Sequence, residues 1–452
     1  MRKLVARRAA VKAVAIASTV LLAPLFGITT ASSAPEAPTQ LAADGLPPEL
    51  AEAVARDLHM TPTEYLDRAA RAQQLRDYAR DFRAERPDAF AGAWMGADGK
   101  PIVAVTSPAA AQIASADGYQ TSLAPISADG LEGSLTQLNQ WVTTLPKELS
   151  QAINSVAIDF LGSQLVISIA DSAIGHLLNL PTLIANIKVI LSPGGGGPVE
   201  RKPMGGDTYI SAPTALSDAS LKSVDVCSFG FNSVDAAGNA LNISAGHCNP
   251  NLDAGSQEAT VYMPDVHNIP SSPELGTFVR STLGDESGLD YSVIKLNERA
   301  VGAGMDQPSV RGANRTTLPV TGTADPIVGA PVCKSGQSST FTCGYVVADR
   351  VETQLFTASG QSKTVRGFAS SACTLGGDSG GAIVSGTLAL GITSGSNAAD
   401  APDCNQANIS LAQYGGTATL GIPIRSILSD IDASSGGGIG SGISVRTRPA
   451  TS

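Results

Sequence analysis

The stretch GGDSGG, residues 376–381, is followed at once by AIV, residues 382–384, which is typical of the start of a strand. A nucleophilic serine has to lie on a tight turn, where backbone N–H groups face the oxyanion that forms on the substrate. Neighbouring glycines permit the unusual torsion angles of such a turn and let a substrate approach closely. The pattern predicts that Ser379 is a catalytic nucleophile. The alternative is a glycine-rich β-turn in which Asp378 and Ser379 occur by chance.

A serine hydroxyl needs a base that takes its proton, and the chain contains 4 histidines. His59 and His176 lie in helical patterns, so we expect them to be ordinary surface or core residues, and His267 lies in a polar loop. His247 differs because it ends a strand-like segment and is followed by Cys248. A neighbouring cysteine can hold the imidazole rigidly, as a general base requires.

The imidazole in turn needs a group that orients it and stabilises its charged form. Asp290 opens the alternating segment DYSVIKL, from which a carboxylate can point inward. A lone aspartate before a strand is more often a turn residue. The prediction for Asp290 therefore depends on its combination with His247 and Ser379.

Residues 205–432 read as an all-β unit, in which short runs of Val, Ile, Thr and Leu alternate with Gly, Asn, Asp and Ser. The segment SPGGGGP has almost no means of packing, and it predicts a linker with a processing site at residues 193–204. Residues 424–431 predict a closing helix, and the Gly/Ser-rich residues 433–452 predict a disordered tail.

Residues 35–192 predict a different, α+β region. Apolar residues recur at helical spacing through the charged residues 47–86, and Thr61 followed by proline predicts the start of a second helix. Residues 90–106 predict a hairpin. Residues 135–191 are apolar and compatible with helix, but their charged residues and a proline argue against a membrane span.

The order His247, Asp290, Ser379, with the segments SAGHC, LDYSVI and GDSGG, resembles the chymotrypsin-like serine proteases. Cys373, six positions before Ser379, is similar to the secreted bacterial branch, the streptogrisins and α-lytic protease. Other segments similar to that branch are CSFGF at 227–231, VCKSG at 332–336 and LGITSG at 390–395. The resemblance covers about half of the chain. It implies two six-stranded antiparallel β-barrels with the active site in the cleft between them.

The resemblance also implies roles for individual residues. Ser379 would be the nucleophile, His247 the general base and then acid, and Asp290 its orienting partner. The backbone N–H groups of Gly377 and Ser379 would form the oxyanion hole. Asp378 would be buried and would need a cation, which relatives supply as an arginine and this chain as Lys334.

Substrate contacts follow from the same resemblance. Ser394, Gly395 and Ser396 would pair with the extended backbone of the substrate. Ser371 lies where a trypsin-like enzyme would place a carboxylate, so we expect an uncharged, apolar residue before the scissile bond.

An alternative is a preference for basic substrates through Asp400 and Asp403, which we expect instead to be solvated loop charges.

All six cysteines lie beyond residue 226, and an even number in one segment of an exported chain indicates three disulfides. The cysteines are Cys227, Cys248, Cys333, Cys343, Cys373 and Cys404. Six cysteines allow 15 pairings. The sequential pairing, 227–248, 333–343 and 373–404, needs only local loops.

The N-terminus predicts export. A basic head, an apolar run over residues 13–28 and small residues near 31–34 indicate a signal peptide, residues 1–34. A membrane anchor is the alternative, but the run is short and Pro24 interrupts it, so no stable membrane association is expected after cleavage. The net charge of −10 argues against nucleic-acid binding. No metal or cofactor is expected, because zinc-type and calcium-loop patterns are missing.

Residues 90–105 resemble, more weakly, the pro-regions of this branch, which act as folding assistants and inhibitors. Residues 107–192 lie outside that resemblance. The expected partners are polypeptide substrates and the chain's own pro-region. We expect a secreted serine endopeptidase that is made as a zymogen and works through an acyl-enzyme. The alternatives are a protease-like protein that only binds or adheres, and an esterase on the same scaffold.

Overall fold

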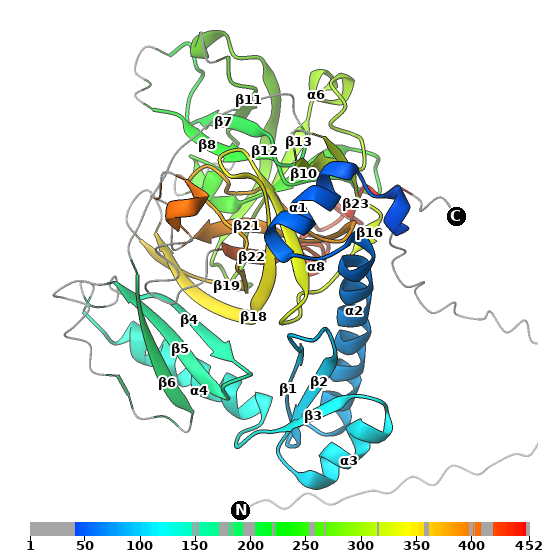
Figure 1. Ribbon diagram of the computed structural model, residues 1–452. Coiled ribbons are helices and arrows are strands. Elements are labelled where there is room, and N and C mark those ends of the chain that lie inside the picture. Colours follow the sequence, from blue (N-terminus) through cyan, green and yellow to red (C-terminus); the bar gives the residue numbers. More distant parts are fainter. Residues whose placement is uncertain are drawn as a thin grey trace, which may run out of the picture. The chain divides into compact units, whose positions relative to one another are not determined.

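The computed structural model describes most of the chain between residues 41 and 448 (Figure 1). Within that range the undescribed residues are 147–148, 150–152, 171–179, 182, 184, 193–203, 219–220, 222, 253–257, 266–267, 314–315, 357–360, 397–400, 402 and 408–418. The expected signal peptide, nearly all of the expected linker, His176, His267 and Asp400 therefore lie outside the described residues.

The charged N-terminal stretch forms two helices, α1 (Pro48–Leu58) and α2 (Pro62–Glu85), after a short 3-10 helix, η1 (Ala43–Gly45). Thr61 caps α2. Its side chain accepts a hydrogen bond from the Glu64 N–H, and the Glu64 carboxylate accepts one from the Thr61 N–H. This reciprocal pair satisfies two donors that the helix itself leaves free. The second helix begins where the sequence predicts.

A small three-stranded sheet follows. β1 (Phe90–Met95) and β2 (Pro101–Val105) pair antiparallel, as the predicted hairpin requires. The chain then passes through α3 (Pro108–Ala116) and returns as β3 (Gln120–Leu123), which lies parallel to β2.

Residues 135–191 differ from the expectation of helix. Helix α4 (Ala128–Thr143) is followed by three strands, β4 (Ile153–Asp159), β5 (Gln164–Ala170) and β6 (Asn186–Ser192). Short apolar runs cannot be divided into helix and strand by periodicity alone. Here the strand form is stabilised because β4 pairs with a strand of the downstream region.

The first large sheet of the downstream region has eight strands, in the order β23-β9-β10-β13-β12-β11-β7-β8. Its strands are β7 (Thr208–Ala212), β8 (Asp225–Ser228), β9 (Phe231–Val234), β10 (Ala240–Ser244), β11 (Thr260–Tyr262), β12 (Glu274–Leu283), β13 (Asp290–Leu296) and β23 (Ser444–Val445). Only Phe229 and Gly230 separate β8 from β9. The fully buried rings of Tyr209, Phe229 and Phe278 fill part of its core.

The second large sheet has the order β17-β20-β21-β22-β19-β18-β4-β5-β6, and β16 pairs with β21 beside that path. Its downstream strands are β16 (Gly322–Thr323), β17 (Pro331–Gly336), β18 (Thr340–Phe356), β19 (Ser362–Ser370), β20 (Ala382–Ser385), β21 (Leu388–Ser396) and β22 (Thr419–Pro423). β17 also pairs with β18, so the strands from β17 to β18 close into a ring.

The remaining described elements are η3 (Gly246–Cys248), η5 (Ile269–Ser271), α6 (Glu298–Gly302), β14 (Ser309–Arg311), β15 (Thr317–Pro319) and α8 (Ile424–Ser434). Together these elements agree with the mostly-β fold predicted for residues 205–432. The expected pair of six-stranded barrels is not confirmed, because the first sheet has eight strands, including β23, and the second has ten, including β16 and β4–β6.

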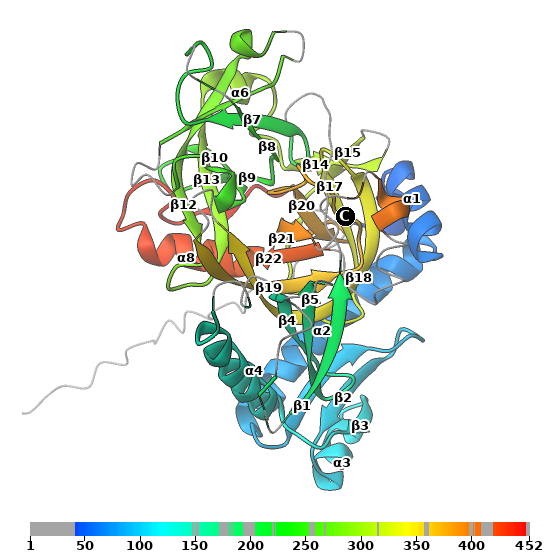
Figure 2. The ribbon, with the colours of Figure 1, turned by 90° about the vertical axis from the view of Figure 1, so that its left-hand side faces the viewer.

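The N-terminal region contacts the second sheet at several points. β4 pairs antiparallel with β18, with Ala157 opposite Val351, so β4–β6 extend that sheet (Figure 2). The side chain of Tyr65, from α2, is fully buried. Its hydroxyl accepts a hydrogen bond of 2.8 Å from the Gly386 N–H. The two regions therefore share both a sheet and a buried contact.

The expectation of a disordered tail is wrong for residues 433–448. β23 pairs antiparallel with the edge strand β9, and the Gly440 N–H donates to the Asp235 carboxylate at 3.0 Å. The tail side chains Ile443 and Val445 are buried. A Gly/Ser-rich composition predicts disorder only where no partner surface exists, and here the open edge of β9 supplies one.

Across the described residues, no helix has both the length and the apolar character needed to cross a membrane.

Candidate active site

The site begins with His247, which lies in η3 directly after β10. The neighbouring Gly246 is required by space, since a Cβ there would lie 1.9 Å from the Thr282 carbonyl oxygen. His247 Nδ1 is 2.7 Å from Asp290 Oδ2. The backbone N–H groups of Gly246 and His247 donate to Asp290 Oδ1 at 2.7 and 3.0 Å. The structure thus brings together the predicted base and its predicted partner.

Asp290 is fully buried at the start of β13 and has one further donor. The Ser394 hydroxyl, from β21, donates to Asp290 Oδ2 at 2.6 Å. The sequence predicts a substrate contact for Ser394 and misses this side-chain contact, because the two residues are 104 positions apart. The carboxylate is therefore oriented by donors from η3 and from β21.

The electrostatics of the pair favour its charged form. Burial tends to raise the pKa of Asp290, but the charge of His247 and hydrogen bonds from His247 and Ser394 outweigh burial and hold the pKa below its usual value. Burial tends to lower the pKa of His247, but the charges of Asp290 and Asp225 and the hydrogen bond to Asp290 raise it above its ordinary value. The imidazole is thus a stronger base than a free histidine.

Ser379 lies half-buried on the predicted glycine turn. Gly377 has φ +91° and Gly380 has φ +84°, and a Cβ at Gly380 would lie 2.0 Å from Ser244 Oγ. The Ser379 carbonyl accepts a hydrogen bond of 2.8 Å from the Ser228 N–H, and Cys248 Sγ lies 4.0 Å from the same oxygen. Ser379 is therefore next to the segment that carries His247.

The Ser379 hydroxyl has no hydrogen bond to His247 among the described contacts. Such catalytic hydrogen bonds are often long without substrate and tighten in its complex.

The predicted oxyanion-hole donors are the N–H groups of Gly377 and Ser379. Within the described part of the chain, neither N–H donates to a protein acceptor. The intervening Asp378 N–H, in contrast, donates to the Leu375 carbonyl at 3.1 Å. The two predicted donors thus remain free for a substrate oxygen.

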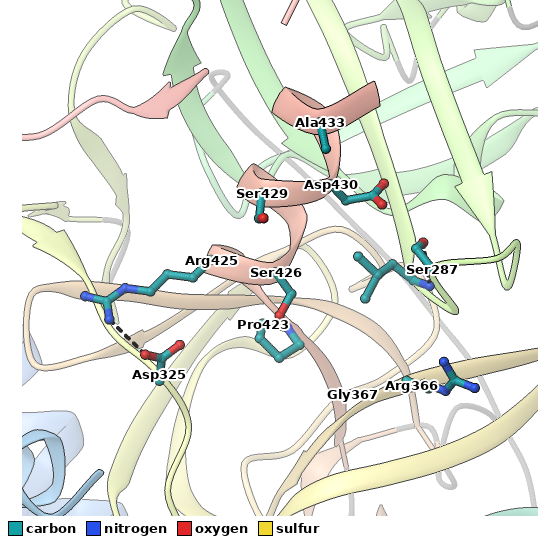
Figure 3. Close-up of a pocket in the computed structure, with 11 residues that line it drawn as sticks. Ser287, Asp325, Arg366, Gly367, Pro423, Arg425, Ser426, Ser429, Asp430 and Ala433 are labelled. Atoms are coloured by element: carbon teal, nitrogen blue, oxygen red, sulfur yellow. Dashed lines mark hydrogen bonds and ion pairs between the residues drawn. The ribbon is translucent and has the colours of Figure 1, made fainter. Parts of the chain in front are cut away.

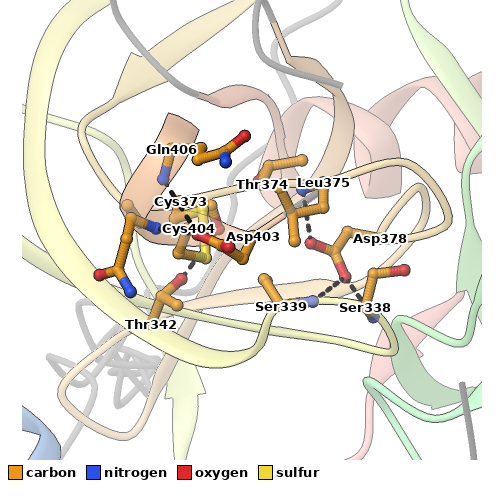
Figure 4. Close-up of a disulfide and its surroundings, with 12 residues drawn as sticks. Ser338, Ser339, Thr342, Cys373, Thr374, Leu375, Asp378, Asp403, Cys404 and Gln406 are labelled. Carbon is orange, nitrogen blue, oxygen red and sulfur yellow. Dashed lines mark hydrogen bonds between the residues drawn. A yellow bond between two sulfur atoms is a disulfide. The ribbon is translucent and has the colours of Figure 1, made fainter. Parts of the chain in front are cut away.

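Asp378 is fully buried and meets its predicted cation. Lys334 Nζ, also fully buried, is 2.9 Å from Asp378 Oδ2. The backbone N–H groups of Leu375, Ser338 and Ser339 also donate to the carboxylate, at 2.9, 2.8 and 3.1 Å (Figure 4). Burial lowers the pKa of Lys334 against the opposing charge of Asp378.

The three disulfides follow the sequential pairing. Cys227–Cys248 ties β8 to η3, the element that carries His247. Cys333–Cys343 joins directly paired residues of β17 and β18. Cys373–Cys404 closes the segment that contains Ser379, and Figure 4 shows this disulfide with the neighbouring Asp378. Donor atoms of Cys227, His247 and Cys248 lie within 4.8 Å of one another, but the two sulfurs are bonded to each other, so these three residues do not make a metal site.

The residues predicted to contact substrate do not all line one cavity with the catalytic candidates. Ser371 is exposed, its hydroxyl accepts a 2.9 Å hydrogen bond from the Tyr345 N–H, and it lines a cavity of about 580 Å³ together with Arg56 and Asp57 of α1. None of the three catalytic candidates lines that cavity.

Gly395 and Ser396 lie on β21, opposite Leu420 and Thr419. Asp403 accepts hydrogen bonds from the Asn405 and Gln406 N–H groups, as a loop residue would.

A second cavity, of about 780 Å³, lies beside α8 (Figure 3). Arg425 on its wall pairs with Asp325 at 2.8 Å, and Asp430 accepts a hydrogen bond from the Tyr291 hydroxyl. None of the three catalytic candidates lines this cavity.

A histidine held by a buried aspartate, next to a serine on a GDSGG turn, is the arrangement of the chymotrypsin-like serine proteases. Comparisons with known proteins agree with that class. Residues 63–121 match the family model described as Alpha-lytic protease pro N-terminal. This match includes the segment whose resemblance to a pro-region the sequence indicated, and it extends past residue 107, further than expected.

Two relatives align with most of the chain. Serine protease 1 of Rarobacter faecitabidus is 28% identical over 391 residues, which are 83% of this chain and 64% of that protein. The match thus spans less than two thirds of that relative. Streptogrisin-C of Streptomyces griseus is 27% identical over 400 residues, 87% of this chain and 78% of that protein. The resemblance to serine proteases of the streptogrisin and α-lytic branch is confirmed.

Among solved structures, Thermobifida fusca protease A is 27% identical, with a TM-score of 0.37, and the match covers 54% of this chain and 98% of that one.

Proposed function

We propose that the chain is a secreted serine endopeptidase that hydrolyses peptide bonds through an acyl-enzyme. The observation that supports this most is the contact between His247 and the buried Asp290, with Ser379 on a turn whose flanking N–H groups are free. The named serine proteases among its relatives support the same activity.

In this mechanism His247 takes the proton of the Ser379 hydroxyl as the oxygen attacks the peptide carbonyl. Asp290, oriented by Ser394, holds the imidazole by Nδ1 and stabilises its positive charge. The N–H groups of Gly377 and Ser379 would bind the oxyanion, each donor contributing about 3 kcal/mol. His247 then gives the proton to the leaving amine, and water releases the acyl group by the same steps.

We propose that residues 35–192 are a pro-region that assists folding and inhibits the protease, removed by cleavage within residues 193–204 after export by a signal peptide at 1–34. The hydrogen bonds of this region to the protease support that role. Gln73 exchanges two with the Asp325 backbone, at 3.0 and 3.1 Å, and the Asp57 carboxylate accepts one from the Cys343 N–H at 2.9 Å.

In the mature enzyme we propose two six-stranded barrels. The second would be the ring from β17 to β18 without β4–β6, and the first would count β8 and β9 as one strand interrupted at Phe229 and Gly230. The absence of a carboxylate at Ser371 favours an uncharged, apolar residue before the scissile bond.

Labelling with a serine-directed fluorophosphonate tests the proposal on the secreted, processed protein. The wild type should take up one label and hydrolyse peptide substrates, and the Ser379→Ala variant should do neither. A folded, processed wild type that takes no label would instead favour a protein that only binds. Ester hydrolysis without peptide hydrolysis would favour an esterase.

A further inference from the structure

The oxyanion hole depends on the direction of one peptide group, that between Gly376 and Gly377. In a planar trans peptide the carbonyl oxygen and the N–H point in opposite directions. Both residues are glycines, and Gly377 has φ +91°, so no side chain resists rotation of this peptide. Whatever holds the Gly376 carbonyl therefore decides where the Gly377 N–H points.

Ser338 holds that carbonyl. Its hydroxyl donates to Gly376 O at 2.5 Å, and it accepts a hydrogen bond of 2.8 Å from Gln337 Nε2. Gln337 is buried, and its Oε1 accepts a hydrogen bond of 3.1 Å from the Thr208 hydroxyl of β7. The Ser338 hydroxyl oxygen thus receives one donor, which leaves the hydroxyl proton for the Gly376 carbonyl.

The two residues also contact Gly377 directly. A Cβ placed on Gly377 would lie 2.1 Å from Gln337 Nε2 and 2.8 Å from Ser338 Oγ. The next carbonyl, that of Gly377, accepts a 2.8 Å hydrogen bond from the Ser228 hydroxyl. The turn between β17 and β18 therefore packs against the loop at Gly376 and Gly377, where its peptides could rotate.

The position of this turn does not depend on the Ser338 side chain. Its backbone N–H groups at Ser338 and Ser339 donate to the buried Asp378 carboxylate (Figure 4). Removal of the Ser338 hydroxyl should therefore leave the turn in place and release only the Gly376 carbonyl.

We propose that Ser338, oriented by Gln337, is a positioning residue that keeps the Gly377 N–H directed into the oxyanion hole. Without it the Gly376–Gly377 peptide can rotate, which withdraws a donor and turns a carbonyl oxygen toward the developing negative charge. This inference rests on the proposed serine-protease function. It involves no change in bonding, only the direction of a hydrogen-bond donor.

The test compares Ser338→Ala with wild type as secreted, processed enzymes acting on a peptide anilide. We expect kcat to fall about 10- to 100-fold, somewhat less than the loss of a whole oxyanion donor, with KM within about twofold. Affinity for a peptide aldehyde, whose adduct carries an oxyanion, should fall by the same factor as kcat/KM. Ser338→Thr should restore most of kcat. Ser429→Ala, on the exposed face of α8, is the matched control and should change nothing.

Two results with an active wild type would overturn the inference. In the first, Ser338→Ala keeps kcat within twofold of wild type. In the second, it loses kcat and thermal stability together. If Ser338→Ala is not secreted, Gln337→Ala takes its place and should lower kcat at least threefold at constant KM; an unchanged kcat there would also overturn it. A wild type that neither cleaves peptides nor takes a fluorophosphonate label would refute the proposed function instead.

Discussion

Replacement of Lys334 by methionine tests how the loop of Ser379 is held. Lys334 and Asp378 are both fully buried, and Lys334 Nζ also donates to the Ser339 hydroxyl at 2.6 Å. Methionine keeps the length of the side chain but removes its charge and donors. Asp378 then remains as a buried carboxylate without a cation.

The size of the effect follows from the donors that remain. Removal of one partner from a buried ion pair costs about 3–5 kcal/mol. Asp378 keeps three backbone N–H donors, from Leu375, Ser338 and Ser339, which stabilise its charge. We therefore expect the lower end, about 3 kcal/mol, or on the order of 100-fold in the ratio of folded to unfolded protein.

The assay is unfolding of the processed enzyme in denaturant, followed by far-UV circular dichroism and by loss of activity, because both tryptophans of the chain, Trp94 and Trp141, lie in the removed region. Lys295→Met, at an exposed lysine on β13, is the control and should change stability by less than about 0.5 kcal/mol. The double variant Lys334→Met/Asp378→Asn should be more stable than Lys334→Met alone, because no unpaired charge is left. A Lys334→Met variant within about 1 kcal/mol of wild type, or a double variant as unstable as the sum of its single changes, would refute the reasoning.

Three further predictions concern other parts of the molecule. Because Asp290 raises the pKa of His247 above its ordinary value and catalysis needs the neutral imidazole, kcat/KM should fall with dropping pH at a higher pH than for a free histidine. A pH–rate profile of Asp290→Asn should show that limb at lower pH, with kcat reduced about 10⁴-fold. Tyr65→Phe leaves the Gly386 N–H without its acceptor, so thermal unfolding of an inactive precursor should show a stability lower by about 1–3 kcal/mol. The stability of the processed enzyme, which no longer contains residue 65, should not change. Truncation after Ser434 removes β23 and two buried apolar side chains, and it should cost the processed enzyme about 3 kcal/mol in denaturant unfolding.

The parts of the site that the sequence predicts are those carried by local patterns. His247 follows a strand and precedes a cysteine, and Asp290 opens an alternating strand, so each pattern already specifies where its side chain lies. The sequential disulfides could be predicted for the same reason, since each closes a short loop.

Features that depend on a distant partner could not be predicted in this way. The strands β4–β6 become strands by adding to β18, and β23 forms on the edge of β9. The sequence of β4–β6 or of β23 contains no sign of the distant strand with which it pairs. Ser338 is a serine in a turn, where serine is common, so its contact with the Gly376 carbonyl has no signal in the sequence.

The replacement of the expected arginine by Lys334 illustrates how the fold compensates for a less directional cation. A guanidinium would orient the Asp378 carboxylate by paired hydrogen bonds, whereas an ammonium supplies little more than charge. Here the direction comes from the backbone, because N–H groups on both sides of the carboxylate, at Leu375 and in the turn at Ser338 and Ser339, already fix its two oxygens. Each of these donors belongs to the loop that carries Ser379 or to the β17–β18 hairpin. The arrangement is present in the unprocessed chain. Order in the oxyanion loop therefore does not wait for a new N-terminus, and we expect latency to depend on the pro-region.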